Sequence, residues 1–341
     1  MARSIVGSGV CPARKFRVGV RYRRGVESDT LVCLNPASAA GRTGRERQAI
    51  LDAIESKLGP VDYEVTRGVG DAERIAAQAR RTGRARLLVA GGDGTINEVA
   101  SGLLGEDEGD GPAPALGLLP LGSGWDLARS LALPRALEAA LDVIAGGETR
   151  QIDAGRAVVR SPDGAPRERF FVNEASAGLS GDTIQVVGRF AKRVGARAGF
   201  ALGAVAAILG HRPLDASVEV DGERLYEGPI SLVVAANGRC FGAGMQVAPK
   251  ARLDDGRLEL VLVRGLSVPS LLANLPSLFA GTHGRHPAVS FHAARSVSIE
   301  PKGRALYADL DGESVGTLPL RAEILPGALE VFAGADAGAP A

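Results

Sequence analysis

The sequence predicts two domains, an α/β domain built on a parallel sheet and a β-rich, sandwich-like domain after it. Three observations lead to this prediction. The chain has 341 residues, which exceeds what one hydrophobic core usually serves. Strand-like and helix-like segments alternate in its first half, and runs of β character replace them in the second half.

The first half begins its alternation at Thr30. Strand-like apolar runs and amphipathic, helix-like stretches follow one another in this order: Leu31 to Leu34, Arg45 to Leu58, Val61 to Val65, Ala72 to Arg81, Leu87 to Ala90, Ile96 to Leu104, and Leu116 to Leu119. A strand–helix rhythm of this kind is typical of a largely parallel sheet with helices on both faces.

After about Asp153 the pattern changes to β-type runs separated by glycine, proline and aspartate. These runs are Phe170 to Asn173, Ala216 to Val220, Ile230 to Ala235, Leu258 to Val263, and Val297 to Ile299. They predict an antiparallel sandwich or barrel. Two further stretches, Arg189 to Leu209 and Ser270 to Ala280, favour helices, which either flank a lipid entrance or simply pack on the sheet.

Charge and composition exclude several classes of protein. Forty basic and thirty-nine acidic residues nearly cancel, so no overall field would attract nucleic acid or an anionic membrane. The three cysteines, Cys11, Cys33 and Cys240, are far apart and predict neither a disulfide framework nor a zinc site, which favours a reducing cytosol. No apolar run reaches the roughly 20 residues of a spanning helix, so any membrane contact must be local.

Both ends of the chain differ from the rest in composition. Residues 1–28 form a basic leader with seven Arg or Lys and no acid before Glu27, and we expect it to be disordered. A basic arm for anionic lipid, or a start codon placed too early, are the alternatives. Residues 334–341 contain only Gly, Ala, Pro and one Asp, which predicts a disordered tail.

A glycine turn carries the first chemical signal. Gly91, Gly92 and Gly94 follow a buried strand and open a helix, where backbone N–H groups can approach an anion closely. We expect Thr95 to cap that helix, and Asp93 to offer a hard oxygen ligand, direct or through water, to Mg²⁺. A purely structural strand-to-helix turn is the alternative. The chain has no G-x-x-x-x-G-K-[ST] motif, so metal and backbone donors would have to hold phosphates.

Two motifs together resemble the diacylglycerol kinase catalytic family. G-G-D-G-T-x-N-E at 91–98 is followed by P-L-G-S-G-W-D-L-A-R at 120–129, and the spacing between them fits. Further matches occur in order at 152–155, 173–178, 248–256 and 311–313, so the resemblance covers about residues 30 to 333. Ser123 replaces a usual Thr and keeps the hydroxyl. Trp125 replaces a usual Asn, which removes an amide contact, although an indole could stack on a base or shape the pocket.

The resemblance implies a fold and an activity. The expected fold is an α/β nucleotide-binding domain at 29–153, like that of NAD kinases and phosphofructokinases, followed by a β-rich lipid-binding domain at 154–320. A terminal segment at 321–333 could return to the first domain. The active site would lie in the cleft between the domains, where ATP and Mg²⁺ would phosphorylate a lipid hydroxyl, diacylglycerol-like or sphingoid, as in the related sphingosine and ceramide kinases.

The resemblance also implies roles for individual residues. Asp311 would be the general base, which accepts the hydroxyl proton late in the transfer, with Glu313 holding Asp311 or a metal-bound water. The other implied residues are the nucleotide-binding Asn35, Gly91, Gly92, Asp93, Gly94, Thr95, Glu98, Gly122 and Ser123, the catalytic Mg²⁺ network of Asp93, Asp126 and Asp153, and Asp255 for a structural Mg²⁺.

Several of these residues have simpler interpretations. Asp126 could cap a helix, and Asp311 could belong to a β-turn before Gly312. Asp255 could belong to a hairpin turn, and Arg129 could form a surface salt bridge as readily as a phosphate contact.

The expected partner is a lipid substrate at a membrane surface. We expect the protein itself to be cytoplasmic and to associate peripherally with the membrane during turnover. No nucleic-acid partner is expected, and a homodimer is left open. Two rival functions are a small-molecule kinase of the NAD kinase type and a catalytically silent lipid-binding regulator. The acceptor lipid cannot be read from the sequence.

Overall fold

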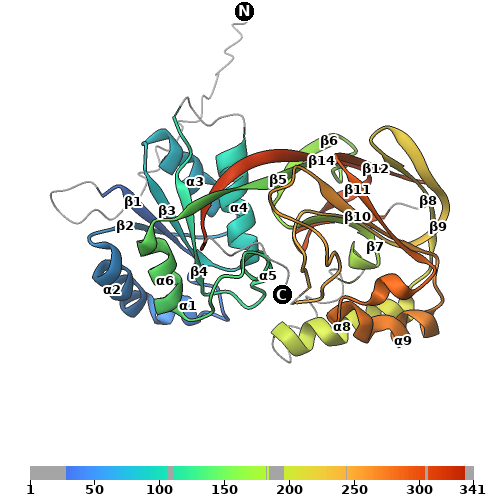
Figure 1. Ribbon diagram of the computed structural model, residues 1–341, viewed down its shortest axis with the longest axis horizontal. Helices are drawn as coiled ribbons and strands as arrows, with labels where there is room; N and C mark the ends of the chain where they lie inside the picture. Colours follow the sequence, from blue (N-terminus) through green and yellow to red (C-terminus); the bar gives the residue numbers. More distant parts are fainter. Residues whose placement is uncertain are drawn as a thin grey trace, which may run out of the picture.

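The computed structural model describes residues 28–105, 111–181, 183, 196–242, 244–303 and 306–334. Apart from Ser28 and Gly334, the leader and the tail expected from the sequence lie outside the described residues. Figure 1 shows two lobes, with the earlier part of the chain in one and most of the later part in the other. The predicted order, an α/β domain followed by a β-rich one, is confirmed.

The first lobe is built on a parallel sheet with the strand order β2-β1-β3-β4. Its elements are β1 (Thr30–Leu34), α1 (Arg42–Arg45), α2 (Arg47–Leu58), β2 (Asp62–Val65), α3 (Asp71–Arg81), β3 (Arg86–Gly91), α4 (Asp93–Leu104), β4 (Ala115–Pro120), α5 (Asp126–Ser130) and α6 (Leu137–Gly146). These bounds agree closely with the strands and helices predicted from periodicity.

Alternate strand residues supply two cores, one on each face of this sheet. Leu87 and Val89 pack on one face together with side chains of α3 and α4. Leu88 and Ala90 face the opposite way, into a second core with side chains of α2 and α6. Successive residues of a strand point to opposite faces, so a strand covered by helices on both sides must be apolar throughout. This explains the uninterrupted apolar runs in the sequence.

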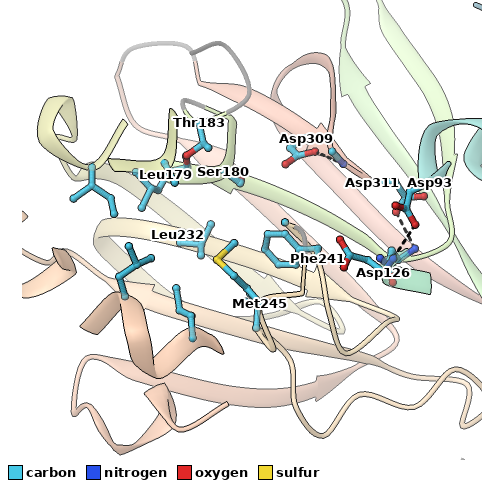
Figure 2. Close-up of a pocket in the computed structure, with 18 residues that line it drawn as sticks. Asp93, Asp126, Leu179, Ser180, Thr183, Leu232, Phe241, Met245, Asp309 and Asp311 are labelled. Carbon is cyan, nitrogen blue, oxygen red and sulfur yellow. Dashed lines mark hydrogen bonds between the residues drawn. The ribbon is translucent and has the colours of Figure 1, made fainter. Parts of the chain in front are cut away.

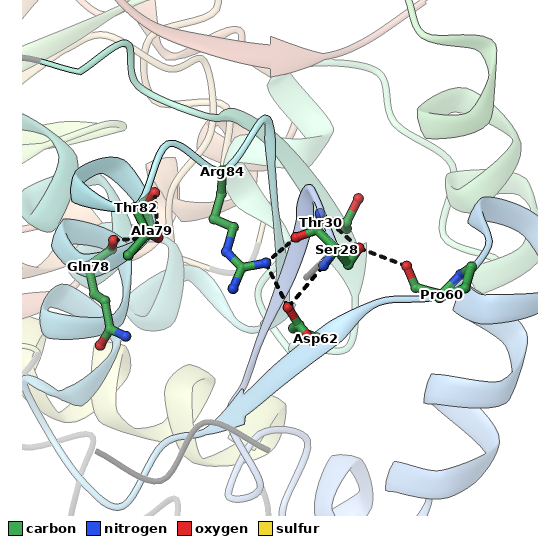
Figure 3. A network of polar contacts seen from close by, with 8 residues as sticks. All are labelled: Ser28, Thr30, Pro60, Asp62, Gln78, Ala79, Thr82 and Arg84. Carbon is green, nitrogen blue, oxygen red and sulfur yellow. Dashed lines mark hydrogen bonds and ion pairs between the residues drawn. The ribbon is translucent and has the colours of Figure 1, made fainter. Parts of the chain in front are cut away.

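A buried ion pair lies at the amino-terminal ends of the strands of this sheet (Figure 3). Arg84 Nη1, just before β3, donates to Asp62 Oδ2 at the start of β2 over 2.6 Å, and both side chains are buried. Arg84 also donates to the Ser28 carbonyl oxygen, and the Ser28 backbone N–H donates to Asp62. The network ties the chain before β1 to the two neighbouring strands, at the edge opposite the glycine turn.

The second lobe contains a closed ring of strands, in which each strand pairs with the next: β7-β9-β8-β12-β14-β13 and back to β7. The later strands are β5 (Thr149–Arg160), β6 (Pro166–Phe171), β7 (Glu174–Gly178), β8 (Leu214–Val220), β9 (Glu223–Ala236), β10 (Leu258–Arg264), β11 (Val289–Ala294), β12 (Ser296–Pro301), β13 (Tyr307–Leu310) and β14 (Glu313–Phe332). A ring leaves its own strands without free edges, and a third core fills it.

Two long strands connect the lobes. In Figure 1, β5 and β14 run together from one lobe to the other. Near its end β14 pairs in parallel with β4, at Val331 and Leu116, so a single hydrogen-bonded sheet extends through both lobes. The carboxyl ends of the parallel strands are thereby held beside the ring. In α/β sheets, ligands usually bind at these carboxyl ends.

Two apolar helices lie side by side below the ring in Figure 1, α8 (Ala196–Gly210) and α9 (Val268–Phe279). The sequence predicted helices at both places, although residues 189–195 of the first lie outside the described residues. Within the described ranges, no helix combines the length and apolarity needed to cross a bilayer.

The contact between α3 and α4 gives a test of the fold. A Cβ at Gly102 of α4 would lie 2.0 Å from the Glu73 carbonyl oxygen, whereas a Cβ at Gly146 of α6 would meet nothing within 4 Å. We expect Gly102→Ala to lower the free energy of unfolding by about 2 kcal/mol or more through overpacking. Gly146→Ala should be neutral or stabilising by up to about 1 kcal/mol. Equal effects in urea denaturation would contradict the close approach.

Candidate active site

The glycine turn between β3 and α4 is held by a contact from β1. Asn35, which follows β1, donates from Nδ2 to Thr95 Oγ1 over 2.9 Å. A Cβ at Gly91 would lie 2.5 Å from the Thr95 side chain. The expectation that Thr95 caps the helix is wrong, because α4 begins at Asp93 with Gly92 as its N-cap and has no side-chain cap. Thr95 lies inside the first turn, where its hydroxyl accepts from Asn35 instead.

The second motif packs against this turn through glycine backbones. A Cβ at Gly122 would lie 2.4 Å from the Gly92 Cα, and one at Gly124 would lie 2.2 Å from Asp93 Oδ2. Asp93 in turn accepts the backbone N–H groups of Trp125 and Asp126, over 2.8 and 3.0 Å. The glycines thus let the two loops pack closely at the start of α4, and we call the backbone surface that they form there, at residues 91–94 and 122–124, the phosphate cradle. Such a cradle, at a helix N-terminus, fits phosphate oxygens.

Trp125 has a backbone conformation that Asn, the usual residue at this position of the motif, adopts more easily. Its φ is 65°, in the left-handed region, where Asn is far commoner than an aromatic residue. The side chain is 4% exposed and belongs to the core of the first lobe. The indole is not among the residues that line the apolar cavity described below, so the suggestion that it stacks on a base or shapes that pocket gains no support.

Three aspartates were expected to form one Mg²⁺ network through water. Asp93 and Asp126 are adjacent, and Arg129 Nη1 lies 2.5 Å from Asp126 Oδ1, so the salt bridge considered for Arg129 is present. Asp153 is buried, and its carboxylate accepts the backbone N–H groups of Gly256 and Gly327 over 2.7 and 2.8 Å. A network shared by all three aspartates stays a prediction.

No group of three His, Cys, Asp or Glu side chains suited to a metal occurs in the part of the chain that the structure describes. Asp255 is exposed, and its Oδ1 accepts the Arg257 N–H at a turn. A structural Mg²⁺ at Asp255 stays a prediction. Asp93 and Asp126 are the two acids of the expected network that the fold places at the glycine turn, and a catalytic Mg²⁺ there stays a prediction.

Asp311 links the two lobes. Its Oδ2 accepts Asn97 Nδ2 from α4 and the Val172 N–H, each over 2.8 Å. Its Oδ1 accepts the N–H groups of Asn173 and Glu174 over 2.8 and 2.9 Å. The residue occupies the turn between β13 and β14, with a φ of 51°, as its simpler interpretation anticipated. Each carboxylate oxygen therefore already accepts two hydrogen bonds.

Glu313 and Glu98 lie on another side of the glycine turn. Glu313 Oε1 would be 3.1 Å from a Cβ at Gly94, and burial, followed by the charges of Glu98 and Asp311, raises the Glu313 pKa. Glu98 accepts the Ala72 N–H over 3.1 Å. Both acids border a second cavity of about 380 Å³. Ser123 is exposed at the rim of the second loop.

Two buried acids near Asp311 were not among the residues predicted from the sequence. Asp309 is 2% exposed and accepts the Gly312 N–H over 2.9 Å. Burial above all, with a further contribution from the Asp311 charge, raises its pKa to about 8. Glu174 is fully buried, and burial raises its pKa well above the ordinary value. For Asp309 the available signal was the D-x-D spacing at 309–311, which puts a second acid two residues before the expected base.

An apolar cavity of about 430 Å³ opens beside these acids (Figure 2). Four carboxylates border it, from Asp93, Asp126, Asp309 and Asp311. The rest of the wall is mainly apolar and comes from β9, α8, α9 and the segments after β7 and β9, and it includes Leu179, Ile208, Leu232, Phe241, Met245, Val247, Leu275 and Leu278. The arrangement suits a molecule with an apolar body and a polar end that is presented to the phosphate cradle.

Comparisons with known proteins agree with this geometry. A family model described as the diacylglycerol kinase catalytic domain matches residues 29–157, and one described as the YegS C-terminal NAD kinase beta sandwich-like domain matches residues 173–333. A protein of Salmonella schwarzengrund named "Probable lipid kinase YegS" is 31% identical over 315 residues, which cover 88% of this chain and 94% of that protein.

Two further likenesses extend the comparison. The protein of the same name from Salmonella gallinarum is 32% identical over 310 residues, with the same coverage. A crystal structure of a diacylglycerol kinase from Bacillus anthracis str. Sterne has a TM-score of 0.67 at 20% identity, and the match covers 90% of this chain and 97% of that one. At that identity the likeness shows the fold alone.

The buried Asp309 predicts how stability depends on pH. Its pKa is raised from 3.8 to about 8 on folding, so above pH 4 the unfolded chain ionises while the folded chain resists ionisation. The resulting loss of stability is absent below pH 4 and grows until about pH 8. Asp309→Asn removes it, so the variant should gain stability relative to the parent protein as pH rises from 4 to 8.

Urea denaturation across that pH range measures the difference. The exposed Asp163 serves as control, since its pKa is lowered, chiefly by the Ser161 hydroxyl, and Asp163→Asn should show no such gain. Parallel stability curves for Asp309→Asn and the parent protein would contradict the buried, uncharged state of Asp309.

Proposed function

The chain belongs to the diacylglycerol kinase family of lipid kinases, as its motifs predicted, and from this premise we propose that it transfers the γ-phosphoryl group of ATP to the hydroxyl of a diacylglycerol-like or sphingoid lipid. One observation carries the proposal. The apolar cavity ends at four carboxylates, beside the glycine cradle at the start of α4. A lipid acyl chain fits the wall of that cavity, and its hydroxyl would face the phosphates.

The cradle supplies donors rather than side-chain cations. The N–H groups at the start of α4, which has no side-chain cap, favour an anion, and the glycines of both loops present backbone without side chains there. Asp93 and Asp126 are the proposed Mg²⁺ ligands. When bound, the ion would neutralise charge that develops on the phosphate oxygens. Arg129, which is paired with Asp126, adds a positive charge at the same place.

The site must also align the acceptor hydroxyl with the γ-phosphorus. Phosphoryl transfer has a loose transition state, so the chain mainly has to bring the acceptor oxygen in line with phosphorus and exclude water. Two carboxylates at the acceptor end, those of Asp309 and Asp311, could orient the hydroxyl and receive its proton. The assignment of Asp311 as general base stays a prediction.

The apolar wall separates this proposal from its rivals. An NAD kinase-like enzyme must accommodate a polar, charged acceptor, which the apolar residues of β9, α8 and α9 would not solvate. A silent lipid-binding regulator would not need the phosphate cradle, yet its glycines and Asp93 are all in place.

We also propose that α8 and α9 meet the membrane from the cytoplasmic side. Each contributes side chains to the cavity, such as Ile208 and Leu275, and each also exposes large apolar side chains, Leu209 at 62% and Phe279 at 51%. An apolar substrate has to leave a bilayer to enter this cavity, and exposed apolar residues beside its lining lower the cost of that contact. Nucleic acid is not a proposed partner, because the net charge is close to zero. A homodimer stays a prediction.

The activity is tested by incubating the purified protein with Mg²⁺, labelled ATP and a panel of diacylglycerol, sphingosine, ceramide and phosphatidylglycerol. We expect labelled phospholipid from at least one of them. Asp93→Ala should lower its formation by several orders of magnitude, because it removes a metal ligand and the acceptor of two loop amides. Asp142→Ala, at an exposed aspartate of α6, should keep the activity. Near-normal turnover by Asp93→Ala would sink the assignment.

The membrane contact is tested by sedimentation with phosphatidylglycerol vesicles. Leu209→Ser and Phe279→Ser should each weaken vesicle binding by about tenfold or more, since each removes the transfer free energy of one large apolar side chain. Val69→Ser serves as control, because Val69 is 95% exposed but lies in the first lobe. If all three substitutions leave vesicle binding unchanged, α8 and α9 do not form the docking surface.

A further inference from the structure

The apolar cavity beside the phosphate cradle has one polar end. Four carboxylates border that end, and the remaining wall is mainly apolar. In Figure 2, Asp126 and Asp311 lie on one side of the cavity, Leu179 and Leu232 lie on the other, and Phe241 lies between them. A ligand that fills the cavity therefore needs a polar group at one end and a hydrocarbon part behind it.

Two hydroxyl groups in the wall of the cavity have partners within the wall itself. Ser180 Oγ lies 2.7 Å from Ser176 Oγ, and Thr183 Oγ1 donates to the Leu179 carbonyl oxygen over 2.7 Å. Neither hydroxyl depends on a ligand for its hydrogen bond. An ester or amide group placed against this part of the wall would lose its hydrogen bonds to water, whereas a plain hydrocarbon chain loses none.

The volume of the cavity matches one long hydrocarbon chain. An apolar protein cavity of about 150 Å³ holds one benzene molecule, which has six carbon atoms. At that ratio, the volume of about 430 Å³ accommodates about 17 carbon atoms. A common fatty chain fills this space by itself, and a second chain of the same length would need as much volume again.

The second cavity does not suit a further chain. It has a volume of about 380 Å³, and charged side chains line it, among them Glu73, Arg167 and Arg169. Hydrocarbon that covered these groups would remove water from them without offering hydrogen bonds in return, which is costly.

The place of the reacting hydroxyl decides where a second chain would have to run. In a diacylglycerol, both chains join the glycerol backbone only a few bonds from the free hydroxyl. With that hydroxyl beside the carboxylates, both chains would begin at the polar end and pass through the same cavity, past Ile208 of α8 and Leu275 of α9. Neither chain could stay in the bilayer while the hydroxyl reached the phosphate cradle. A cavity with room for one chain therefore selects against a two-chain lipid.

We infer that the acceptor is a lipid alcohol with one long hydrocarbon chain, such as a monoacylglycerol or a sphingoid base, rather than a two-chain lipid. This inference rests on the proposed lipid kinase function, because it identifies the acceptor of the same site. In the transfer, the lipid oxygen bonds to the γ-phosphorus of ATP while the bond from that phosphorus to the β,γ-bridging oxygen breaks. The products are ADP, a single-chain lipid phosphate and the proton of the hydroxyl.

The number of chains is tested with two pairs of acceptors in detergent micelles, with ATP and Mg²⁺ present. The pairs are 1-palmitoylglycerol with 1,2-dipalmitoylglycerol, and sphingosine with N-palmitoylsphingosine, so each pair offers the same primary hydroxyl with one or two chains. In every pair that is phosphorylated, the single-chain lipid should have a kcat/KM at least about tenfold higher than the two-chain lipid. An equal or higher value for a two-chain lipid would overturn the inference.

The place of the chain is tested by narrowing the cavity at Ala204 of α8, which borders it. With single-chain acceptors of increasing length, kcat/KM should be highest at about 16 to 18 carbon atoms in the parent enzyme. Ala204→Phe adds a ring of six carbon atoms to the wall, so the best length should fall by about four to six carbon atoms. Val205→Phe is the matched control and should keep the best length of the parent, because Val205 is 37% exposed on the same helix and is not among the lining residues. An unchanged best length in Ala204→Phe would show that the chain lies elsewhere.

Binding without ATP separates this inference from the proposed function. In native mass spectrometry the parent protein should bind one molecule of 1-palmitoylglycerol or sphingosine, and Ala204→Phe should bind it about tenfold more weakly. If neither lipid binds, the inference is wrong. If two-chain lipids are phosphorylated as well as their single-chain counterparts, the inference fails and the proposed function stands. If single-chain lipids bind as expected but no lipid is phosphorylated, the proposed function fails, and the acceptor role fails with it.

Discussion

The carboxylate of Asp311 is the contact on which the geometry of the site depends. It joins Asn97, on the helix that begins at the phosphate cradle, to the backbone amides at the start of β7 in the other lobe. Charge-assisted hydrogen bonds of this kind are roughly twice as strong as neutral ones, and here four converge on one half-buried group. With β5 and β14 as continuous backbone links, the contact holds the acceptor end of the cavity beside the glycine turn.

The site concentrates carboxyl groups where a stable fold would avoid them. Asp309 and Glu174 are buried side by side, and Asp93 and Asp126 border the same cavity, with Arg129 paired to Asp126. Buried acids cost stability because burial disfavours their charged forms. Such a cost persists where the perturbed acids serve chemistry, and a cation bound with ATP would relieve part of it.

The sequence was a reliable guide where local pattern decides structure. Apolar runs, amphipathic periodicity and glycine turns predicted the parallel sheet and its helices, because both faces of that sheet are covered and its turns are short. The family and the two-domain fold followed from motifs. The closed ring of strands could be expected only as a sandwich or barrel, since its closure depends on the pairing of β7 with β13, whose residues lie more than a hundred positions apart in the sequence.

The residues that were misplaced or missed depend on long-range register in the same way. Thr95 was expected to cap a helix that in fact begins two residues earlier. Asp153 accepts the amides of Gly256 and Gly327, which follow it by more than a hundred positions, so its local sequence could not predict these partners. Glu174 and Asp309 meet only because β7 pairs with β13, and no local pattern announces that pairing.

In the proposed function, the phosphate cradle and the apolar cavity act as a single site that is aligned by the contact between Asn97 and Asp311. The most direct test is the single-turnover rate of lipid phosphorylation by Asn97→Ala at saturating concentrations of both substrates. The account predicts that ATP and lipid each bind with nearly unchanged affinity, while the rate falls by about 10², because alignment rather than binding is lost. A rate equal to that of the parent enzyme would contradict the claim.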